Sequence, residues 1–374
     1  MRIVTTLMIR DEADIVGAML THQREQGVDH VIVTDNASVD GTVDLLRTFE
    51  RQGFVTLWHD PEHRKQQYRV VTRMARHAAT ELGADWVINA DADEFMVARD
   101  PGRTIRDVLA AVPPSVDVLR IPVVNLTGAP SRVGSGLARL HLRDQRSESE
   151  LTTAGIPFHP TPNAVHRGHP EVEIAQGNHR AEAPGWGAPV DALDAEVLHL
   201  PWRSWKQYSY KVRVSGEAYL ANPELAPSPR HHGMQDFRRL QQGRLESTYV
   251  AKHPTAEEAA EGIASGAFAP ETRLAHLEGP LTPGFVADER YGDAEQQSLS
   301  RLGRQFRAVE LAGELEAARI QAAHDMAVEQ RDAALADNRR LNEELAGIRR
   351  RKVVRLTDKV ARGLRRPPHD TAAD

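Results

Sequence analysis

The chain has 374 residues, enough for one large domain or two ordinary ones, and its 40% hydrophobic and 27% charged residues are typical of a globular protein with a hydrophobic core. The formal net charge of −6 gives no general attraction to nucleic acid, and the absence of cysteine excludes disulfides, thiolate metal sites and cysteine nucleophiles. The short apolar run at residues 3–9 is followed by no cleavage site, and no stretch is long enough to span a membrane, so we expect a cytoplasmic protein.

Strand-like and helix-like segments alternate along the N-terminal part of the chain. Apolar runs predict strands over residues 2–9, 30–34, 54–58 and 85–90, and amphipathic spacing predicts helices over 12–26, 43–52 and 63–82. This alternation favours an α/β fold with a mostly parallel central sheet and helices on both faces.

The middle of the chain is less regular. We predict a helix over 104–112, a strand over 116–126, a last strand over 193–200 and a helix over 202–220. Residues 127–192 lose periodicity and are rich in Gly, Pro and His, which is more typical of a binding surface than of a linker. We place one domain at residues 1–220 and a connector with short helices at 221–295.

A long helix without proline is predicted over residues 296–350. Its apolar spacing allows a coiled coil, and hence a homodimer, but it is not a regular heptad, and a single solvated helix fits equally well. Residues 351–374 would form a basic amphipathic segment and a disordered tail. The basic stretch 349–366 favours contact with anionic lipid over a solvated tail, and it lacks the aromatic residues that would stack on nucleic acid bases.

An apolar run from Trp86 to Ala90 ends in three carboxylates, Asp91, Asp93 and Glu94. The C-terminal ends of strands are where open α/β sheets bind ligands. In an extended backbone Asp91 and Asp93 would point the same way, and two such oxygen ligands suit Mg²⁺ or Mn²⁺ carrying a diphosphate. An acidic surface turn is the alternative, but apolar residues on both sides of the motif argue against it.

The first two predicted strands also end in carboxylates, at Asp11 and Asp35. In a parallel sheet these ends and Asp91 open on the same edge, where converging like charges are unfavourable unless a cation or a hydroxyl-rich ligand is bound. A nucleotide meets both conditions, because its ribose and base donate hydrogen bonds and a metal bridges its diphosphate. We assign most of the loop 36–42 to a turn and a helix cap.

Three motifs, in this order and spacing, resemble glycosyltransferase family 2: Leu7 to Ile15, Val33 to Thr42, and Trp86 to Phe95 with the sequence Asp-Ala-Asp-Glu-Phe. The resemblance is to the bacterial branch that carries an Asp-x-Asp-Glu-Phe motif, and it covers residues 1–215. It implies the GT-A fold, a nucleoside-diphosphate sugar donor, a divalent metal and inversion at the anomeric carbon. Residues 1–126 would then bind the nucleotide sugar, and residues 127–220 would face the acceptor.

The resemblance also implies roles for single residues. Asp11 and Asp35 would contact the nucleoside, Asp91 the ribose or the metal's water shell, and Asp93 the metal. A late histidine is a further metal ligand in such enzymes, and imidazole is an acceptable Mn²⁺ ligand beside carboxylates. His199 is the first choice because it ends a predicted strand, and His179 is the second.

Cationic side chains would neutralise the departing diphosphate. Arg203 and Lys206 follow the last predicted strand, and a rival set lies on the third predicted helix: Arg64, Lys65, Arg69 and Arg73. Inverting transfer also needs a general base for the acceptor hydroxyl. The candidates are Glu94, Glu171, Glu173, Glu182 and Asp191, among which we favour Glu173 or Glu182. The histidines at 159, 166, 169 and 179 are too irregularly spaced to predict zinc.

We therefore expect an inverting glycosyltransferase of the hexosyltransferase class, acting in glycan biosynthesis. It would use Mn²⁺ or Mg²⁺ to move a sugar from a nucleoside diphosphate to a hydroxyl on a glycan, lipid or protein. It would be cytoplasmic, or peripheral at the inner face of the membrane. One alternative is a non-catalytic GT-A-like scaffold assembled through the C-terminal helix. A nucleotidyltransferase ranks lower, because Arg10 to Ala13 is not a Gly-rich phosphate loop.

Overall fold

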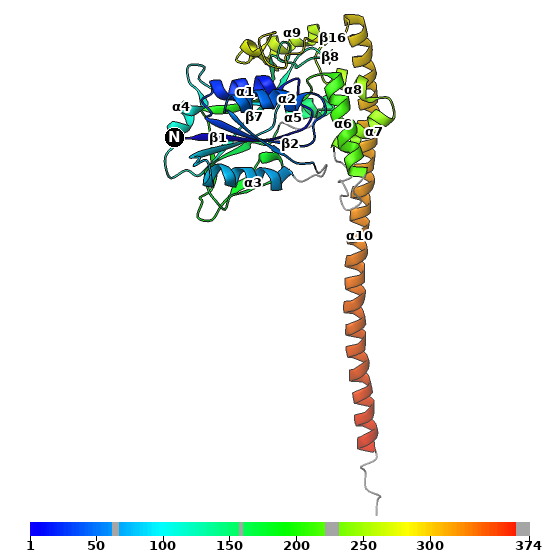
Figure 1. Cartoon of the computed structure of the whole chain (residues 1–374). Coiled ribbons are helices and arrows are strands. Elements are labelled where there is room, and N and C mark those ends of the chain that lie inside the picture. Colours follow the sequence, from blue (N-terminus) through cyan, green and yellow to red (C-terminus); the bar gives the residue numbers. More distant parts are fainter. Residues whose placement is uncertain (62–66, 157–159, 221–231, 364–374) are drawn as a thin grey trace, which may run out of the picture. The chain divides into compact units, whose positions relative to one another are not determined.

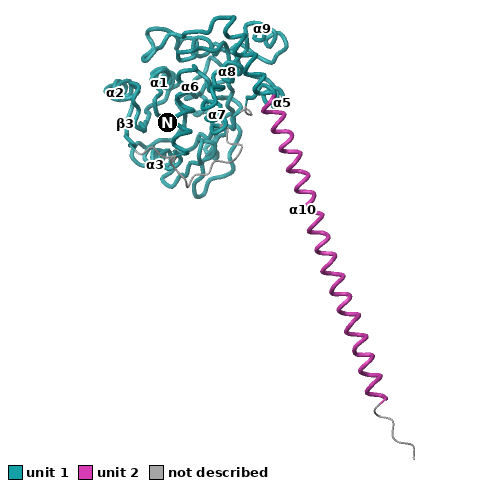
Figure 2. The backbone as a smooth tube through the Cα atoms, turned by 90° about the vertical axis from the view of Figure 1, so that its right-hand side faces the viewer, with its two compact units in different colours: residues 1–308 teal, residues 309–374 magenta. Residues whose placement is uncertain are grey.

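The computed structural model describes the whole chain except residues 62–66, 157–159, 221–231 and 364–374. It divides into two compact units, residues 1–308 and 309–374 (Figure 2). The first unit holds the stretch 1–220 together with the described part of the predicted connector, and the helix of the second unit continues a helix that begins in the first.

A seven-stranded sheet forms the centre of the first unit, with the strand order β13-β6-β10-β4-β1-β2-β3. The four strands predicted first are parallel neighbours: β1 (Ile3–Ile9), β2 (His30–Asp35), β3 (Val55–His59) and β4 (Trp86–Ala90). β6 (Val118–Ile121) pairs with β13 (Val190–Asp191) at the other edge. β10 (Asn163–Arg167) lies antiparallel between β4 and β6, although we predicted no strand within 127–192.

Helices cover both faces of this sheet. α1 (Val16–Glu25) and α2 (Thr42–Arg51) lie on one face, and α3 (Gln67–Thr80) lies on the other (Figure 1). Successive strand residues point to opposite faces, so Val31 and Val33 belong to the core with α1 and α2, whereas Ile32 packs with Met74 of α3. The predicted α/β class is therefore confirmed. The first residues of the helix predicted over 63–82 lie outside the described residues.

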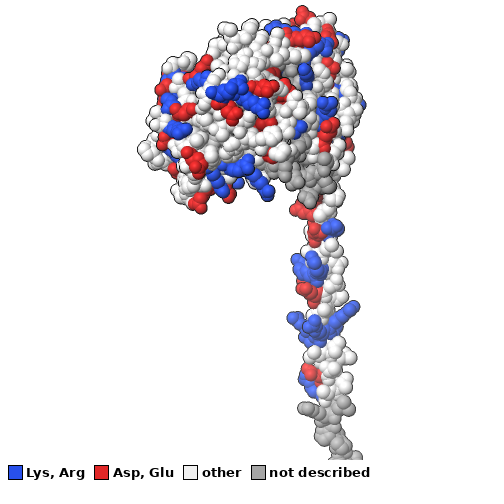
Figure 3. Space-filling view, viewed as in Figure 1, with Lys and Arg blue, Asp and Glu red and all other residues white. Residues whose placement is uncertain are grey.

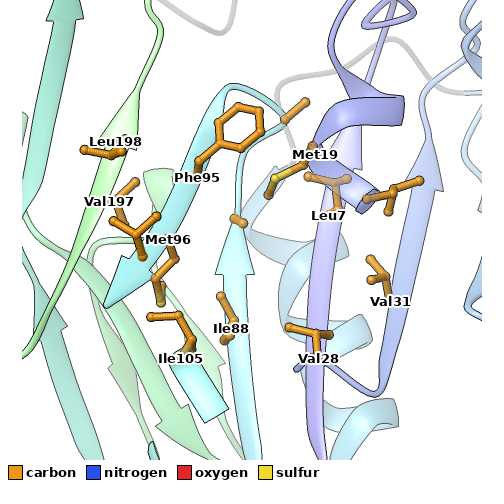
Figure 4. Packing of buried hydrophobic residues seen from close by; sticks show 14 of the residues in the cluster. Leu7, Met19, Val28, Val31, Ile88, Phe95, Met96, Ile105, Val197 and Leu198 are labelled. Carbon is orange, nitrogen blue, oxygen red and sulfur yellow. The ribbon is translucent and has the colours of Figure 1, made fainter. Parts of the chain in front are cut away.

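A second sheet of five strands, ordered β15-β9-β7-β14-β5, lies beside the first. Its strands are β5 (Glu94–Ala98), β7 (Val123–Thr127), β9 (Leu142–Asp144), β14 (Ala195–His199) and β15 (Phe268–Pro270). The strand predicted over 116–126 is in fact two strands in different sheets, divided at Pro122, which has no N–H to donate to a ladder. Phe95, Met96, Val197 and Leu198 of this sheet share one core with Met19 of α1 (Figure 4).

The other elements of the first unit are mostly short, apart from α6 with 16 residues, and three helices begin with capping boxes at Thr104, Ser147 and Thr255. These elements are α4 (Ile105–Ala110), β8 (Ser131–Val133), α5 (Glu148–Ala154), β11 (Glu173–Ile174), η1 (Gln176–Asn178), β12 (Ala181–Glu182), α6 (Trp205–Leu220), α7 (His232–Gln241), α8 (Leu245–Ala251), α9 (Ala256–Ser265), η2 (Ala275–Leu277) and β16 (Glu289–Arg290). Tyr208 of α6 and Tyr249 of α8 lie in a separate core of these helices.

The last helix, α10 (Asp293–Gly363), contains the predicted helix 296–350 and continues through the described part of the basic segment. The predicted tail at 364–374 lies outside the described residues. Its apolar side chains beyond residue 308 are mostly exposed. Whether it pairs with a second copy stays a prediction. Among the helices of the described residues, none is both long and apolar enough to cross a lipid bilayer.

Candidate functional site

The C-terminal ends of β1, β2 and β4 lie at one edge of the seven-stranded sheet, as predicted. Ile9 of β1 is in register with Asp35 of β2, and Leu7 of β1 with Ala90 of β4. The loops that carry Asp11 and Asp91 therefore leave the sheet at the edge where β2 ends in Asp35.

Ser38 connects the first two of these carboxylates. Its hydroxyl accepts a hydrogen bond from the backbone N–H of Asp11 at 2.9 Å, and its own N–H donates to both Asp35 oxygens at 3.3 Å. Asp11 has a left-handed φ of 55°, and its Oδ1 accepts from the N–H of Val39 at 2.7 Å. His59 Nδ1 lies 3.3 Å from Asp35 Oδ2. Asp11 and Asp35 thus share one rigid loop junction.

The rest of the loop 36–42 holds the backbone that follows Asp11. Asp40 accepts from the N–H of Ala13 at 3.0 Å, and the Thr42 hydroxyl accepts from the N–H of Glu12 at 2.9 Å. Asp40 also accepts from the Thr42 N–H at 3.0 Å at the start of α2. These contacts agree with a turn role for the loop, whereas the N-cap position of α2 is Gly41, so the N-cap residue has no side chain to cap this helix as predicted.

Asp91 and Asp93 lie in a tight turn between β4 and β5, so our expectation of an extended backbone at this motif was wrong. The carbonyl of Asp91 accepts from the N–H of Glu94 at 3.2 Å. Asp91 Oδ1 accepts from Gln67 Nε2 at 3.1 Å and from Asn178 Nδ2 at 3.3 Å. Burial and the nearby Asp93 raise the pKa of Asp91 to about 6.

Arg203 joins three carboxylates in a buried charge cluster. Its side chain is 0% exposed, with Nη1 at 3.2 Å from Asp93 Oδ2, Nε at 3.0 Å from Asp14 Oδ2, and Nη2 bonded to Glu12. Lys211 of α6 lies 3.4 Å from Asp93 Oδ2 and 3.5 Å from Glu12 Oε1, and 55% of its side chain is exposed. The protein itself therefore supplies cations to Asp93, one of the carboxylates that we expected to need a bound cation, and to its neighbours Glu12 and Asp14.

This burial corrects the predicted role of Arg203. Direct contact with a diphosphate is not available to a side chain that is fully buried and bonded to three carboxylates. Lys211 is the partly exposed cation at this position, and the attraction of Asp93 holds the pKa of Lys211 above its usual range. Of the rival set, Arg64 and Lys65 lie outside the described residues, and Arg69 and Arg73 lie on α3.

His199 stands at the end of β14, beside Asp93. Its Nδ1 donates to Oδ1 of Asn125 at 2.9 Å, because an amide oxygen only accepts. The lone pair of Nε2 then faces Asp93 Oδ1 at 4.0 Å. Burial lowers the pKa of His199, which favours the neutral ring that a metal binds.

No three His, Asp or Glu side chains within the described ranges converge closely enough to hold a metal by themselves. Asp93 and His199 form a pair of a carboxylate and a neutral imidazole. Such a pair fits a divalent ion that takes its other ligands from water and a bound diphosphate, as Mg²⁺ commonly does.

The Glu94 side chain is buried and bonded to β10. Its Oε2 accepts from Asn163 Nδ2 of β10 at 2.6 Å, and burial together with Asp91 and Asp93 raises the pKa of Glu94 to about 8. Because the carboxyl group keeps its proton at neutral pH, Glu94 is a weak candidate for the general base.

The two glutamates favoured as general base face each other on the ribbon of β11 and β12. Both are exposed; Glu173 lies 3.7 Å from Arg76, and Glu182 lies 3.3 Å from Arg180. These ion pairs are separate from the buried cluster around Asp93. The ribbon nevertheless approaches the site, because η1 between its strands carries Asn178, which donates to Asp91. The next residue, His179, is exposed.

Sequence reasoning missed three contributors: Lys211, Tyr210 and Asn178. Tyr210 donates its hydroxyl to Asp11 Oδ2 at 2.7 Å. By helical spacing, Tyr208 and Val212 share one side of the predicted helix 202–220, and Lys211 borders that side. The sequence pattern does not show that this helix lies beside the edge of the sheet, so these contacts could not be predicted from it.

A family comparison matches residues 5–125 to glycosyltransferase family 92, which is less than half of the chain. The matched stretch includes all three loops that carry Asp11, Asp35 and Asp91. The match supports the prediction of a glycosyltransferase, whereas the assignment to family 2 is not confirmed. A comparison with curated proteins finds no match.

Among solved structures, the chain is similar to S. aureus TarS 1-349 in complex with UDP-GlcNAc, with 12% identity, a TM-score of 0.38, and coverage of 84% of this chain and 92% of that one. A second S. aureus TarS structure is similar with 12% identity and a TM-score of 0.35, and the match covers 71% of this chain and 45% of that one. A third similar structure is glucosyl-3-phosphoglycerate synthase from Mycobacterium tuberculosis with Mn²⁺, UDP and glucosyl-3-phosphoglycerate, with 12% identity, a TM-score of 0.28, and coverage of 61% and 81%.

Proposed function

We propose that this chain is an inverting, metal-dependent glycosyltransferase with a GT-A fold. It moves a sugar from a nucleoside-diphosphate sugar to a hydroxyl of a glycan, lipid or protein. The observation that carries the proposal is the single sheet edge at which Asp11, Asp35, Asp91 and Asp93 come together. The family match over the same residues supports it.

The nucleoside would bind at the junction of Asp11 and Asp35. A carboxylate has about four acceptor positions. The Asp35 side chain is 1% exposed and has long contacts of 3.3 Å with the Ser38 N–H and with Nδ1 of His59, whose side chain is 63% exposed. If His59 moved aside, Asp35 would accept from base or ribose hydroxyls. Asp91, whose pKa is raised, would ionise fully beside a cation and accept from the ribose or from water bound to a metal.

The diphosphate would lie between Lys211 and a divalent ion. Asp93 and His199 would hold Mn²⁺ or Mg²⁺, which when bound supplies positive charge for the departing nucleoside diphosphate. Lys211 can turn its exposed ammonium toward a phosphate while Arg203 keeps Asp93 and Glu12 neutralised from behind. Asp93 thus stays ionised and ready to bind a cation.

The acceptor hydroxyl needs a base on the side opposite the leaving group. We propose Glu173 or Glu182, because both are exposed and the ribbon that carries them is anchored at Asp91 through Asn178. Replacing each by glutamine should lower the transfer rate for the true base and leave the binding of the donor unchanged.

The first test is a thermal-shift panel of nucleoside diphosphates and their sugars, with and without Mn²⁺, followed by an assay for release of the nucleoside diphosphate. A tight ligand raises the melting temperature by mass action. Asp93→Ala should remove the Mn²⁺-dependent shift and the release while the protein still folds. Asp194→Ala, at a carboxylate that is 70% exposed, is the matched control.

The outcomes separate the alternatives. Full release by Asp93→Ala would refute the proposed site. A wild-type protein that is stabilised by a nucleotide sugar but releases no nucleoside diphosphate, with or without acceptor, would be the ligand-binding scaffold instead.

A further inference from the structure

The C-terminal part of α10 carries a concentration of positive charge that the proposed transferase site does not use. Residues 349–362 contain seven Lys or Arg and a single acidic residue, Asp358, in a chain whose net charge is −6. The whole segment is helical and exposed. Figure 3 shows Lys and Arg side chains gathered along this part of the helix, with few Asp and Glu.

Helical spacing places most of the basic and most of the apolar side chains of this segment on different faces, with Arg349 at the end of the apolar one. Lys352, Arg355, Lys359 and Arg362 recur every three or four residues and so share one face of the helix. Apolar side chains share another face at the same spacing, and they are exposed: Val353 by 63%, Leu356 by 69% and Val360 by 58%. The result is an amphipathic helix with a basic side and an aliphatic side.

We propose that residues 349–362 of α10 form a docking surface for an anionic lipid bilayer. Valine and leucine side chains enter the boundary between headgroups and acyl chains, and the basic side chains lie at the level of the acidic headgroups. Each Lys or Arg near such a surface increases binding about fivefold, so the cluster supplies most of the affinity.

Two other occupants fit these residues less well. A second copy of the same helix would place like charges side by side over the whole segment, which is destabilising. A nucleic acid would match the charge, but residues 349–362 contain no aromatic side chain to stack on bases and present aliphatic ones instead. Only a lipid surface uses both faces.

The test is co-sedimentation of the full chain with vesicles of phosphatidylcholine, with and without phosphatidylglycerol. Wild type should bind only the anionic vesicles, and less at high salt. Replacing Lys352, Arg355, Lys359 and Arg362 by glutamine should lower binding several-hundred-fold, at about fivefold per charge. The matched control removes four positive charges from the same helix at Arg319, Arg331, Arg339 and Arg340, and should keep most of the binding.

A second variant tests the aliphatic face. Val353→Ser, Leu356→Ser and Val360→Ser together should weaken vesicle binding while leaving binding to a single-stranded oligonucleotide unchanged. If vesicle binding is unaffected, the surface is a general polyanion binder and the proposal is overturned, as it is if wild type ignores anionic vesicles at low salt. Release of nucleoside diphosphate without vesicles is measured in parallel, so failure of lipid docking is distinguished from failure of the transferase proposal.

Discussion

Replacing Arg203 by methionine should destabilise the first unit by about 3–5 kcal/mol, the usual cost of removing one partner from a buried ion pair. The Arg203 side chain is 0% exposed, and its partners Glu12, Asp93 and Asp14 are 8%, 6% and 18% exposed. Methionine retains an apolar stem in place of the arginine methylenes, so the loss reports mainly on charge. A loss of this size is a large part of the roughly 5–15 kcal/mol that stabilises a typical domain.

The destabilisation should depend on pH. In wild type, burial already raises the pKa of Glu12 against the opposing attraction of Arg203. Without that attraction, the folded-state pKa of Glu12 rises further above its unfolded value. The pKa of Asp93, which the neighbouring cations hold below its usual range, rises toward its unfolded value, so part of the stabilisation from ionised Asp93 is lost. Ionisation of Glu12 then opposes folding at high pH, and this penalty disappears as pH falls through the raised pKa of Glu12. The difference from wild type should be larger at pH 7.5 than at pH 5.

Urea unfolding followed by circular dichroism at both pH values measures this difference. Arg180→Met is the control, because the Arg180–Glu182 pair is 68% and 65% exposed and should contribute less than about 1 kcal/mol. Adding Glu12→Gln to Arg203→Met should recover part of the loss by removing one uncompensated charge. If Arg203→Met stays within about 1 kcal/mol of wild type at both pH values, Arg203 does not neutralise the cluster as described.

Three further predictions concern other sites. Glu196 is hydrogen-bonded to Arg143 and Arg273, which hold its pKa at about 2 against the effect of burial. Ionised Glu196 should therefore stabilise the folded state by at most about 3 kcal/mol, fully above the unfolded pKa near 4.5 and not at all as pH falls toward 2. In a plot of the urea unfolding midpoint against pH, Glu196→Gln should reduce the decline at acidic pH. Gly168→Ala would place a Cβ 2.0 Å from a backbone oxygen and should cost about 1–3 kcal/mol in urea unfolding, whereas Gly187→Ala, with nothing within 4 Å, should be neutral. Lys211→Met should raise the donor KM about ten- to a hundredfold, the worth of a charged hydrogen bond; a larger effect of Lys206→Met would show that the wrong cation was assigned.

The parts of the fold that follow from local pattern were predictable from sequence. β1 to β4 are apolar runs separated by amphipathic helices, and their parallel order places Asp11, Asp35 and Asp91 at one edge. β10 was not predictable in this way, because its five residues, Asn-Ala-Val-His-Arg, have little strand character and are held by pairing on both sides.

At the candidate site, the carboxylates at the strand ends could be chosen from the sequence, whereas Arg203 was chosen with another role and Lys211 was missed. Asp-x-Asp directly after an apolar run lies at the carboxyl end of a strand, where open α/β sheets bind ligands, so Asp91 and Asp93 could be chosen without coordinates. The burial of Arg203 and the approach of Lys211 depend on how α6 packs against the first loop, a contact across almost the whole domain. No local spacing contains that information.

The central position of β10 has a consequence for biogenesis. Residues 163–167 fill the gap between β4 and β6, so a nascent chain that has emerged only as far as residue 126 exposes one unpaired edge on β4 and both edges of β6, whose other neighbour is β13. The ligand-binding half therefore cannot close during synthesis until the ribosome has delivered about forty more residues. Until then those open edges are where a chaperone, or a neighbouring nascent chain, would attach.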